Sequence, residues 1–246
     1  MSHPASCYYT KYEGDQHWHK GLTIALIGHT FCINSATPVQ REFYHSSSKR
    51  MQPLRYGVAQ SLDGYIAPPD ESTTWIVDDP SIDFDAIYAS FDAFIMGRKT
   101  YEIVAGDGTT KNPLEGRPKE KVVVVSRTLN PDDHPTITVI AGGHIEHVKS
   151  MKKTVNGGIW LMGGGSLAAE FLAAGLLDGI DAAIMPVILG AGFKLITDQG
   201  MEAKPEAKPV GKQEQGIRRH YSLKLCSLER LTPSGILMTK YDILYD

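Results

Sequence analysis

The sequence predicts an α/β protein with a mostly parallel sheet and an antiparallel hairpin at its C-terminal end. Three observations lead to this class. From Arg55 onward, short apolar segments alternate with segments in which apolar residues recur at helical spacing. Segment 121–129, KVVVVSRTL, has four valines in a row, which suits a parallel strand buried on both faces. Segment 218–245 alternates on either side of the turn signal PSG at 233–235, and it therefore predicts a hairpin.

The first part of this pattern reads as strand, loop, helix, strand and short helix. The strand RYGVAQSL ends near the turn signal Asp63-Gly64, and a Pro- and Asp-rich loop follows it. Apolar residues then recur at helical spacing, and the next apolar run ends at Gly97, where a charged helix opens. The predicted ranges are strand 55–62, loop 65–80, helix 81–91, strand 93–97, helix 98–106 and exposed loop 106–120.

The second part repeats the alternation and then ends in two paired strands. Ser166 is the predicted N-cap of the helix that follows the GGG sequence, because a serine hydroxyl can accept a hydrogen bond from a free backbone N–H. The predicted ranges are strands 121–129 and 136–142, helix 144–155, strand 157–165, helix 166–177, strand 178–190, a polar insertion at 199–216 and the hairpin.

Length and composition are those of a globular domain with an appendage. The chain has 246 residues, of which 42% are hydrophobic, and its formal net charge is -3. That charge produces no long-range field that would attract nucleic acid or an anionic membrane. No apolar run approaches the roughly 20 residues that a membrane-spanning helix needs. The three cysteines are far apart, which argues against a disulfide framework and suits a reducing, cytoplasmic location.

Residues 1–50 differ from the rest and predict an N-terminal extension to a domain of residues 51–246. They mix polar, aromatic and Ser-rich stretches without periodicity. We expect a poorly ordered extension without a catalytic role. Mitochondrial targeting is the alternative, because a leader that contains Ser and Arg fits it, although the acidic residues in the segment count against it.

Groups suited to phosphate follow three of the predicted strands. In open α/β sheets, ligands bind beyond the carboxyl ends of the strands. Free N–H groups at a helix start favour phosphate, which Arg binds as a fork and Lys as a point charge. Each segment alone reads more readily as solvated surface or a tight turn, but together they indicate a phosphorylated dinucleotide. The segments are Gly97-Arg98-Lys99-Thr100, Ser126-Arg127 and Gly163-Gly164-Gly165-Ser166.

A Rossmann domain is disfavoured, although Gly163, Gly165 and Ala168 satisfy GxGxxA. The Rossmann fingerprint belongs in the first βαβ unit and is followed by an acidic residue about 20 positions later. Here the pattern falls late in the chain, and Asp178 and Asp181 read as turn residues before the next strand.

The other titratable residues give weaker indications. The histidine pairs lack a convincing third ligand, so no metal site is predicted. Neither a Ser-His-Asp order nor a GxSxG elbow is present. Asp63, Asp83 and Asp85 are candidate acids near a substrate. Asp83 and Asp85, together with Asp78 and Asp79, could equally be charges that favour a helix start. The histidine pairs are His144 and His147 around Glu146, and His17 and His19 around Trp18.

Five segments in this order give a specific resemblance: YGVAQSLDGYIA, IMGRKTYE, VVVVSRTL, WLMGGGSLAAEFL and PVILGAGFKL. From about Arg55 to Tyr245 the chain resembles the dihydrofolate-reductase-like superfamily, and most of all the branch that contains the reductase domain of bacterial riboflavin biosynthesis. The resemblance implies a three-layer fold and an NADPH-dependent reductase of a small molecule, and it implies that a homodimer can form. Residues 1–50 have no counterpart.

The resemblance also implies roles for particular residues. The phosphates of NADPH would be held by Gly97, Arg98, Lys99 and Thr100, and the diphosphate would lie against Gly163, Gly164, Gly165, Ser166 and Leu167. Ser126 and Arg127 would sit by the adenosine 2′-phosphate, and Ala59 and Trp75 would lie beside the nicotinamide. The resemblance does not identify the proton donor, and the proton would come from a carboxylate, Asp85, Asp63 or Asp83, or from a bound water.

The substrate half departs from the riboflavin branch. The position just before the glycine turn holds Met162 instead of the usual glutamate, and the arginines that usually follow the Trp are replaced by the acidic stretch IVDDPSIDFDAIY. The expected activity is hydride transfer to a small heterocyclic substrate, with 5-amino-6-(5-phosphoribosylamino)uracil as one candidate. Dihydrofolate reduction and a non-catalytic NADP-binding module are the alternatives.

Overall fold

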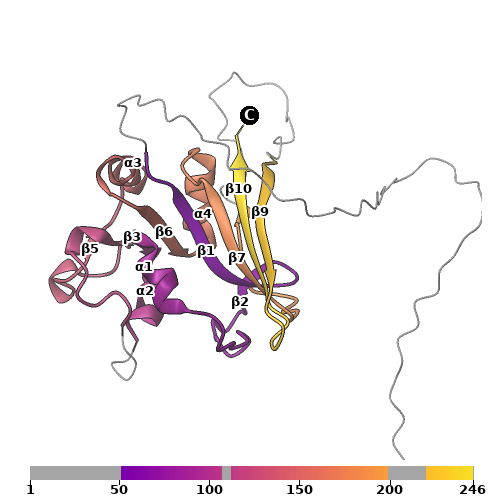
Figure 1. Ribbon diagram of the computed structural model, residues 1–246. Helices are drawn as coiled ribbons and strands as arrows, with labels where there is room; N and C mark the ends of the chain where they lie inside the picture. The colour runs from indigo at the N-terminus through magenta and orange to yellow at the C-terminus, as the bar shows by residue number, and fades with distance from the viewer. Residues whose placement is uncertain (1–50, 107–111, 199–219, 246) are drawn as a thin grey trace, which may run out of the picture. The chain divides into compact units, whose positions relative to one another are not determined.

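The computed structural model describes residues 51–106, 112–198 and 220–245 of the chain (Figure 1). The predicted extension, 1–50, and the predicted polar insertion, 199–216, lie outside these ranges. Within the described residues, no helix is both long and apolar enough to cross a membrane.

A single eight-stranded sheet runs through the described part of the chain, in the order β5-β4-β3-β6-β1-β7-β10-β9. Neighbouring strands from β5 to β7 are parallel, whereas β10 pairs antiparallel with both β7 and β9. The predicted mostly parallel sheet with an antiparallel C-terminal hairpin is therefore confirmed. The strands are β1 (Leu54–Ser61), β3 (Phe91–Gly97), β4 (Val122–Val125), β5 (Thr138–Ile140), β6 (Gly158–Gly163), β7 (Gly179–Met185), β9 (Ser222–Arg230) and β10 (Leu237–Leu244).

The central strands feed two cores, one on each face of the sheet. On β3, Ala93 and Ile95 belong to one buried cluster, and Phe94 and Met96 belong to another. The valines of β4 alternate between the same two clusters. Because both faces are buried, the strand sequences read as continuous apolar runs.

Helices cover both faces and complete three layers (Figure 1). On the first face, α3 (His144–Thr154) and α4 (Gly165–Ala173) contribute Met151 and Phe171 to the cluster that contains Ile95. On the second face, α1 (Phe84–Ala89) and α2 (Arg98–Ala105) contribute Tyr88 and Tyr101 to the cluster that contains Phe94. The predicted three-layer arrangement is thus confirmed.

The helix predicted at 81–91 is shorter, because two aspartates define its start. The carboxylate of Asp83 accepts a hydrogen bond from Ala86 N at 2.9 Å and acts as the N-cap of α1. The carboxylate of Asp79 binds the backbone N and hydroxyl of Ser81 in a turn just before it. Both interactions favour a cap over continued helix.

Two further expectations were wrong. Gly164, not Ser166, is the N-cap of α4, and no side chain caps this helix. The predicted loop 65–80 begins with a short strand, β2 (Tyr65–Ala67), which pairs antiparallel with β8 (Phe193–Lys194). Pairing between segments so far apart in sequence leaves no local signal.

Candidate functional site

The three predicted phosphate segments follow three strands that are neighbours in the sheet, β4, β3 and β6. β3 and β6 are parallel, with Met96 paired to Gly163. After β3 the chain enters α2 on the second face, and after β6 it enters α4 on the first face. A place where adjacent parallel strands send their connections to opposite faces is where ligands bind in open α/β sheets.

Both helices that leave this point begin at a glycine without a capping side chain. Gly97 is the N-cap of α2 and Gly164 is the N-cap of α4. A Cβ added at either position would meet no atom within 4 Å. The first N–H groups of a helix have no intrahelical partner, and the helix dipole places positive charge there. The two glycines thus give an anion open access to backbone donors.

At the other two positions of the GGG sequence, glycine is required because a larger residue would clash with its neighbours. At Gly163, where φ is 154°, an added Cβ would lie 2.6 Å from Thr100 Oγ1. At Gly165 it would lie 2.2 Å from the Lys194 carbonyl oxygen. The Gly163–Thr100 contact joins the end of β6 to the first turn of α2, so the two glycine segments form one surface. Ser166 is exposed, whereas the side chain of Leu167 is buried in the first-face core.

The three cations near this edge differ in their partners. Arg98 is paired with Glu102 in its own helix, with 2.6 Å between Nη1 and Oε1. Lys99 forms an ion pair with Glu71 and lies over the Phe193 ring, 5.1 Å from its centroid. Arg127 is exposed and has no hydrogen bond or ion pair with the described residues. The cation left for a ligand is therefore Arg127.

Ser126 shapes the turn that carries Arg127. Its hydroxyl accepts hydrogen bonds from Thr128 N at 3.1 Å and from Leu129 N at 2.9 Å, and the residue is buried. The hydroxyl thus stabilises the turn after β4 and sets the direction of the chain at Arg127.

A small apolar cluster at the C-terminal ends of β1 and β7 includes two predicted cofactor residues. Ala59 and Trp75 pack against buried Met185 and Ile236. The indole Nε1 of Trp75 is buried and has no hydrogen-bond partner in the described structure. A buried unpartnered N–H costs free energy unless a partner is supplied.

The loop that carries Trp75 is anchored by Asp79, which sequence reasoning did not single out. The buried Asp79 carboxylate accepts hydrogen bonds from Ser234 Oγ at 2.5 Å, Ser81 Oγ at 2.6 Å and Ser81 N at 2.9 Å. These donors, Ser234 first, lower the pKa of Asp79. The spacing Asp-Pro-Ser is a turn signal that predicts the local bonds, but not the link to Ser234 in the hairpin turn.

The candidate acids occupy different environments. Asp63 accepts hydrogen bonds from Leu189 N at 3.1 Å and Gly190 N at 2.7 Å, and so ties the turn after β1 to the loop after β7. The Ser61 hydroxyl, assisted by these amides, lowers the pKa of Asp63, which opposes proton donation. Asp85 is exposed in the first turn of α1 and lines a surface groove with Tyr88 and Arg117.

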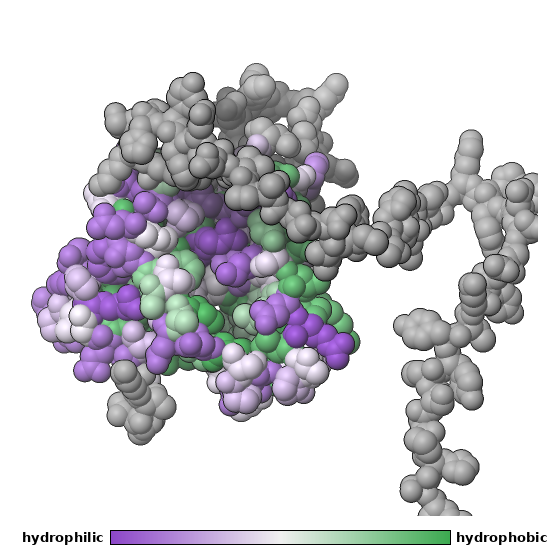
Figure 2. Space-filling model, in the orientation of Figure 1, coloured by the Kyte–Doolittle hydropathy of each residue, from purple (hydrophilic) through white to green (hydrophobic). Residues whose placement is uncertain are grey.

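The loops at this end of the sheet carry exposed apolar residues. Figure 2 shows hydrophobic residues gathered at its lower right, over the loops that follow β1 and β7. Leu62, Ile188 and Phe193 are more than two-fifths exposed there. An apolar rim beside backbone anion donors suits a ligand that has both a ring system and phosphates.

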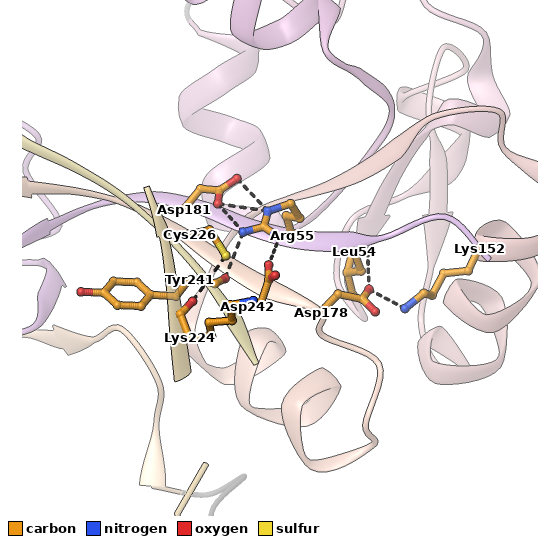
Figure 3. Close-up of polar contacts among 9 residues, drawn as sticks. All are labelled: Leu54, Arg55, Lys152, Asp178, Asp181, Lys224, Cys226, Tyr241 and Asp242. Atoms are coloured by element: carbon orange, nitrogen blue, oxygen red, sulfur yellow. Dashed lines mark hydrogen bonds and ion pairs between the residues drawn. The ribbon is translucent and has the colours of Figure 1, made fainter. Parts of the chain in front are cut away.

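A second polar cluster lies at the opposite, N-terminal end of β1 (Figure 3). Arg55 donates to Asp181 and Asp242, and these hydrogen bonds and charges raise its pKa despite the opposing effect of burial. Beside it, Asp178 accepts from Leu54 N at 2.6 Å and from buried Lys152 at 2.5 Å. These side chains satisfy one another and join neighbouring strands, so they form a structural anchor.

Of the two histidine pairs, His144 and His147 lie among the described residues, whereas His17 and His19 lie outside them. His144 Nε2 lies 2.6 Å from a Glu170 carboxylate oxygen, which links α3 to α4. No group of three metal-ligating side chains occurs among the described residues.

Comparison with known proteins gives several relatives in sequence. The uncharacterized protein YyaP of Bacillus subtilis is 34% identical over 149 residues, 57% of this chain and 78% of YyaP. YwjB of the same organism is 28% identical over 169 residues, 67% of this chain and 94% of YwjB. The riboflavin biosynthesis protein RibD of Mycobacterium tuberculosis is 27% identical over 173 residues, 65% of this chain but only 50% of RibD.

Solved structures share the fold. A putative riboflavin biosynthesis protein from Shewanella superposes with a TM-score of 0.57 at 21% identity, covering 79% of this chain and all of that one. A deaminase/reductase from Thermotoga maritima gives a TM-score of 0.53 at 16% identity, covering 80% of this chain and 58% of that one. The family model of the RibD C-terminal domain matches residues 53–221. The expected resemblance is thereby confirmed, and the chain belongs to the RibD C-terminal domain family.

Proposed function

We propose that this protein is an NADPH-dependent reductase of a small heterocyclic substrate. The observation that carries the proposal is the pair of glycine N-caps, Gly97 and Gly164, at the point where β3 and β6 send their helices to opposite faces. Family membership supports it, as does the reductase activity for which the Thermotoga maritima protein is named.

The residues present fit a dinucleotide phosphate. The helix starts at Gly97 and Gly164 would hold the diphosphate through backbone N–H groups, assisted by Thr100. Arg127 would bind the adenosine 2′-phosphate from the turn that Ser126 stabilises. Trp75 and Ala59 would border the nicotinamide, and the free indole N–H of Trp75 would find an acceptor there. The bound cofactor would supply the hydride.

Asp83 caps α1, and of the two candidate acids that remain, Asp85 is the better proton donor to the substrate. It is exposed beside a groove, whereas the carboxylate of Asp63 is engaged by two backbone N–H groups and has a lowered pKa. A general acid must hold a proton near the working pH, and a lowered pKa removes it. We assign Asp63 an anchoring role instead.

Membership of the family supports two substrate candidates. 5-Amino-6-(5-phosphoribosylamino)uracil, the compound after which the Thermotoga maritima reductase is named, is the first candidate, and dihydrofolate is the second. The riboflavin branch usually has a glutamate at the position of Met162. Met162 packs against the second-face core and offers no carboxylate there. This difference favours a substrate with fewer polar groups at that point.

The test is a fluorescence titration of the full-length protein with NADPH and NADH, followed by NADPH oxidation assays on pyrimidines and pterins. We expect saturable NADPH binding and turnover of at least one compound. Absence of NADPH binding would refute the proposal. Binding without turnover of any pyrimidine or pterin would instead support a non-catalytic NADP-binding module.

We also propose that the protein forms a homodimer through the β9–β10 hairpin. Leu223, Leu225 and Leu228 of edge strand β9 are 46%, 49% and 59% exposed. An irregularity in the β9–β10 pairing places all three opposite alternate residues of β10, namely Ile243, Tyr241 and Thr239. All three leucines therefore lie on one face of the hairpin, and we call them the leucine stripe.

A further inference from the structure

The cations at the start of α2 are already neutralised by carboxylates of the protein. Arg98 is paired within its helix with Glu102, and Lys99 is paired with Glu71, a residue 28 positions earlier in a different loop. Both side chains of the Lys99–Glu71 pair are partly exposed, 55% and 41% respectively. Exposed ion pairs are individually weak, so a bound anion can compete with this one.

Glu71 lies in a turn with an unusual backbone conformation. Glu71 N donates to Pro68 O at 3.0 Å, which closes a tight turn. Its φ is 60°, the left-handed region, and among the described residues it is the one non-glycine residue with positive φ. Residues other than glycine adopt this conformation at a cost, and such outliers cluster at functional sites.

Lys99 is contacted from a second side by β8, which also packs against Gly165. Its Nζ lies 5.1 Å from the centre of the Phe193 ring in β8, and the next residue, Lys194, places its carbonyl against Gly165. The turn at Glu71, the start of α2 and β8 therefore meet at Lys99. An anion that reaches the open Gly97 N-cap comes within reach of the same lysine.

We propose that Glu71 sets the affinity of the site for the cofactor by competing with the cofactor phosphate for Lys99. This inference rests on the proposed function, because the competing anion is the diphosphate of NADPH. The ammonium group of Lys99 cannot neutralise the Glu71 carboxylate and the diphosphate fully at once, and the carboxylate repels the incoming phosphate. Glu71 thus lowers affinity and keeps the site neutral when no cofactor is bound.

The competition acts on the diphosphate and not on the 2′-phosphate. Arg127, which follows β4, has no competing carboxylate among the described residues. The selectivity for NADPH over NADH that Arg127 would give the site is therefore independent of Glu71. Removing the Glu71 charge is therefore expected to strengthen binding of both cofactors by the same factor.

The experiment measures the dissociation constants of NADPH and NADH for Glu71→Gln by fluorescence titration. We expect both to fall about two- to fivefold, the range of one exposed ion pair. The matched control is Glu120→Gln, which removes the same charge just before β4, at the opposite end of the parallel strands from the glycine N-caps, and should leave both constants unchanged. Glu71→Asn, which tolerates positive φ, should reproduce the gain and exclude an effect of the altered turn.

A double-mutant cycle with Lys99→Gln tests whether Glu71 acts through the lysine. We expect Lys99→Gln to weaken binding and to reduce the gain that Glu71→Gln produces. Unchanged or weaker NADPH binding by Glu71→Gln would overturn the inference, as would a full gain in the Lys99→Gln background. If the wild-type protein binds NADPH and Glu71→Gln binds no better, only this inference fails. If no form binds NADPH, the proposed function fails.

Discussion

At the scale of single residues, pairing decides which of the predicted groups can act on a ligand. The sequence places Arg98, Lys99 and Arg127 at strand ends, which led to the expectation that all would hold phosphate. In the structure, both Arg98 and Lys99 have carboxylate partners. Only the partner of Lys99 comes from a different segment of the chain. The partner of Arg98 lies four residues away and could have been predicted from helix spacing, whereas Glu71 could not.

Arg127 is therefore the residue expected to distinguish the two cofactors. Arg127→Ala removes the one unpaired cation of the set and should weaken NADPH about tenfold or more, at about 1.5–3 kcal/mol for a charged hydrogen bond. NADH, which has no 2′-phosphate, should bind almost unchanged. Titration of both cofactors checks this, with Arg98→Ala as the comparison. Equal losses for NADPH and NADH in Arg127→Ala would contradict the 2′-phosphate assignment.

Asp79 gives a prediction about acid stability. Three donated hydrogen bonds lower its pKa below the value of about 3.9 in an unfolded chain. Its contribution to folding is thus fully present above about pH 4 and is lost as pH falls through the lowered pKa. Asp79→Asn should reduce stability at pH 7 and flatten its decline below about pH 4. Denaturant unfolding of both proteins from pH 7 to pH 3 measures this, and parallel curves would argue against the assigned role.

At the scale of elements, the sequence predicts strands and helices well where local patterns define them, and less well where distant segments meet. The four valines and the apolar run ending at Gly97 give β4 and β3 correctly, since burial on both faces leaves a continuous apolar sequence. The predicted start of α4 was wrong, because serine is a common N-cap residue and Ser166 suggested a cap there. Position 165 must be glycine because the carbonyl of Lys194, distant in sequence, packs against it. The β2–β8 pairing was missed because it too joins segments that are distant in sequence.

The glycines at these element boundaries should respond differently to the same substitution. Gly97 has φ -79° and open space around a Cβ, so Gly97→Ala should leave folding intact or stabilise it by about 0.4–1 kcal/mol. The methyl group would occupy the space of the bound anion, and NADPH binding should weaken at least tenfold. Gly165→Ala places a Cβ 2.2 Å from a backbone oxygen and should cost about 1–3 kcal/mol.

Thermal unfolding and NADPH titration of the two alanine variants separate these effects. Stability should fall only in Gly165→Ala, and Gly97→Ala should show weak binding in a fully folded protein. Normal cofactor binding by Gly97→Ala would mean that the α2 N-terminus does not hold the phosphate.

At the scale of the whole molecule, the two ends of the parallel strands have different tasks. Their N-terminal ends are joined by Arg55, Lys152 and the acidic side chains around them, all mutually satisfied. Their C-terminal ends leave the glycine N-caps open and carry exposed apolar loops. The stabilising polar contacts are thus concentrated away from the edge that is free to bind a ligand. The fold class predicts which end of the strands binds a ligand, but it does not predict the individual side-chain pairs.

The leucine stripe at the far edge of the sheet is an exposed apolar surface without a partner among the described residues. The two ends of its face differ. Arg230 lies at one end, and the rings of Tyr221 and Tyr245, packed edge to face with their centroids 6.0 Å apart, lie at the other. In a two-fold dimer the same patch meets itself in reverse, which brings each arginine to the partner's rings and leucine to leucine. The patch is therefore complementary to its own copy.

Light scattering on a sizing column tests this dimer, with Leu225→Lys/Leu228→Lys as the disrupting variant. The wild type should elute as a dimer at micromolar concentration, and the double variant should be a monomer, because two charged groups would be buried in an apolar contact. Ser222→Lys, which adds a charge on the opposite face of the same strand, should remain a dimer. NADPH binding of the double variant should be unchanged, since the stripe lies on strands remote in the sheet from β3 and β6. A monomeric wild type, or a double variant that stays dimeric, would exclude the leucine stripe as the contact surface.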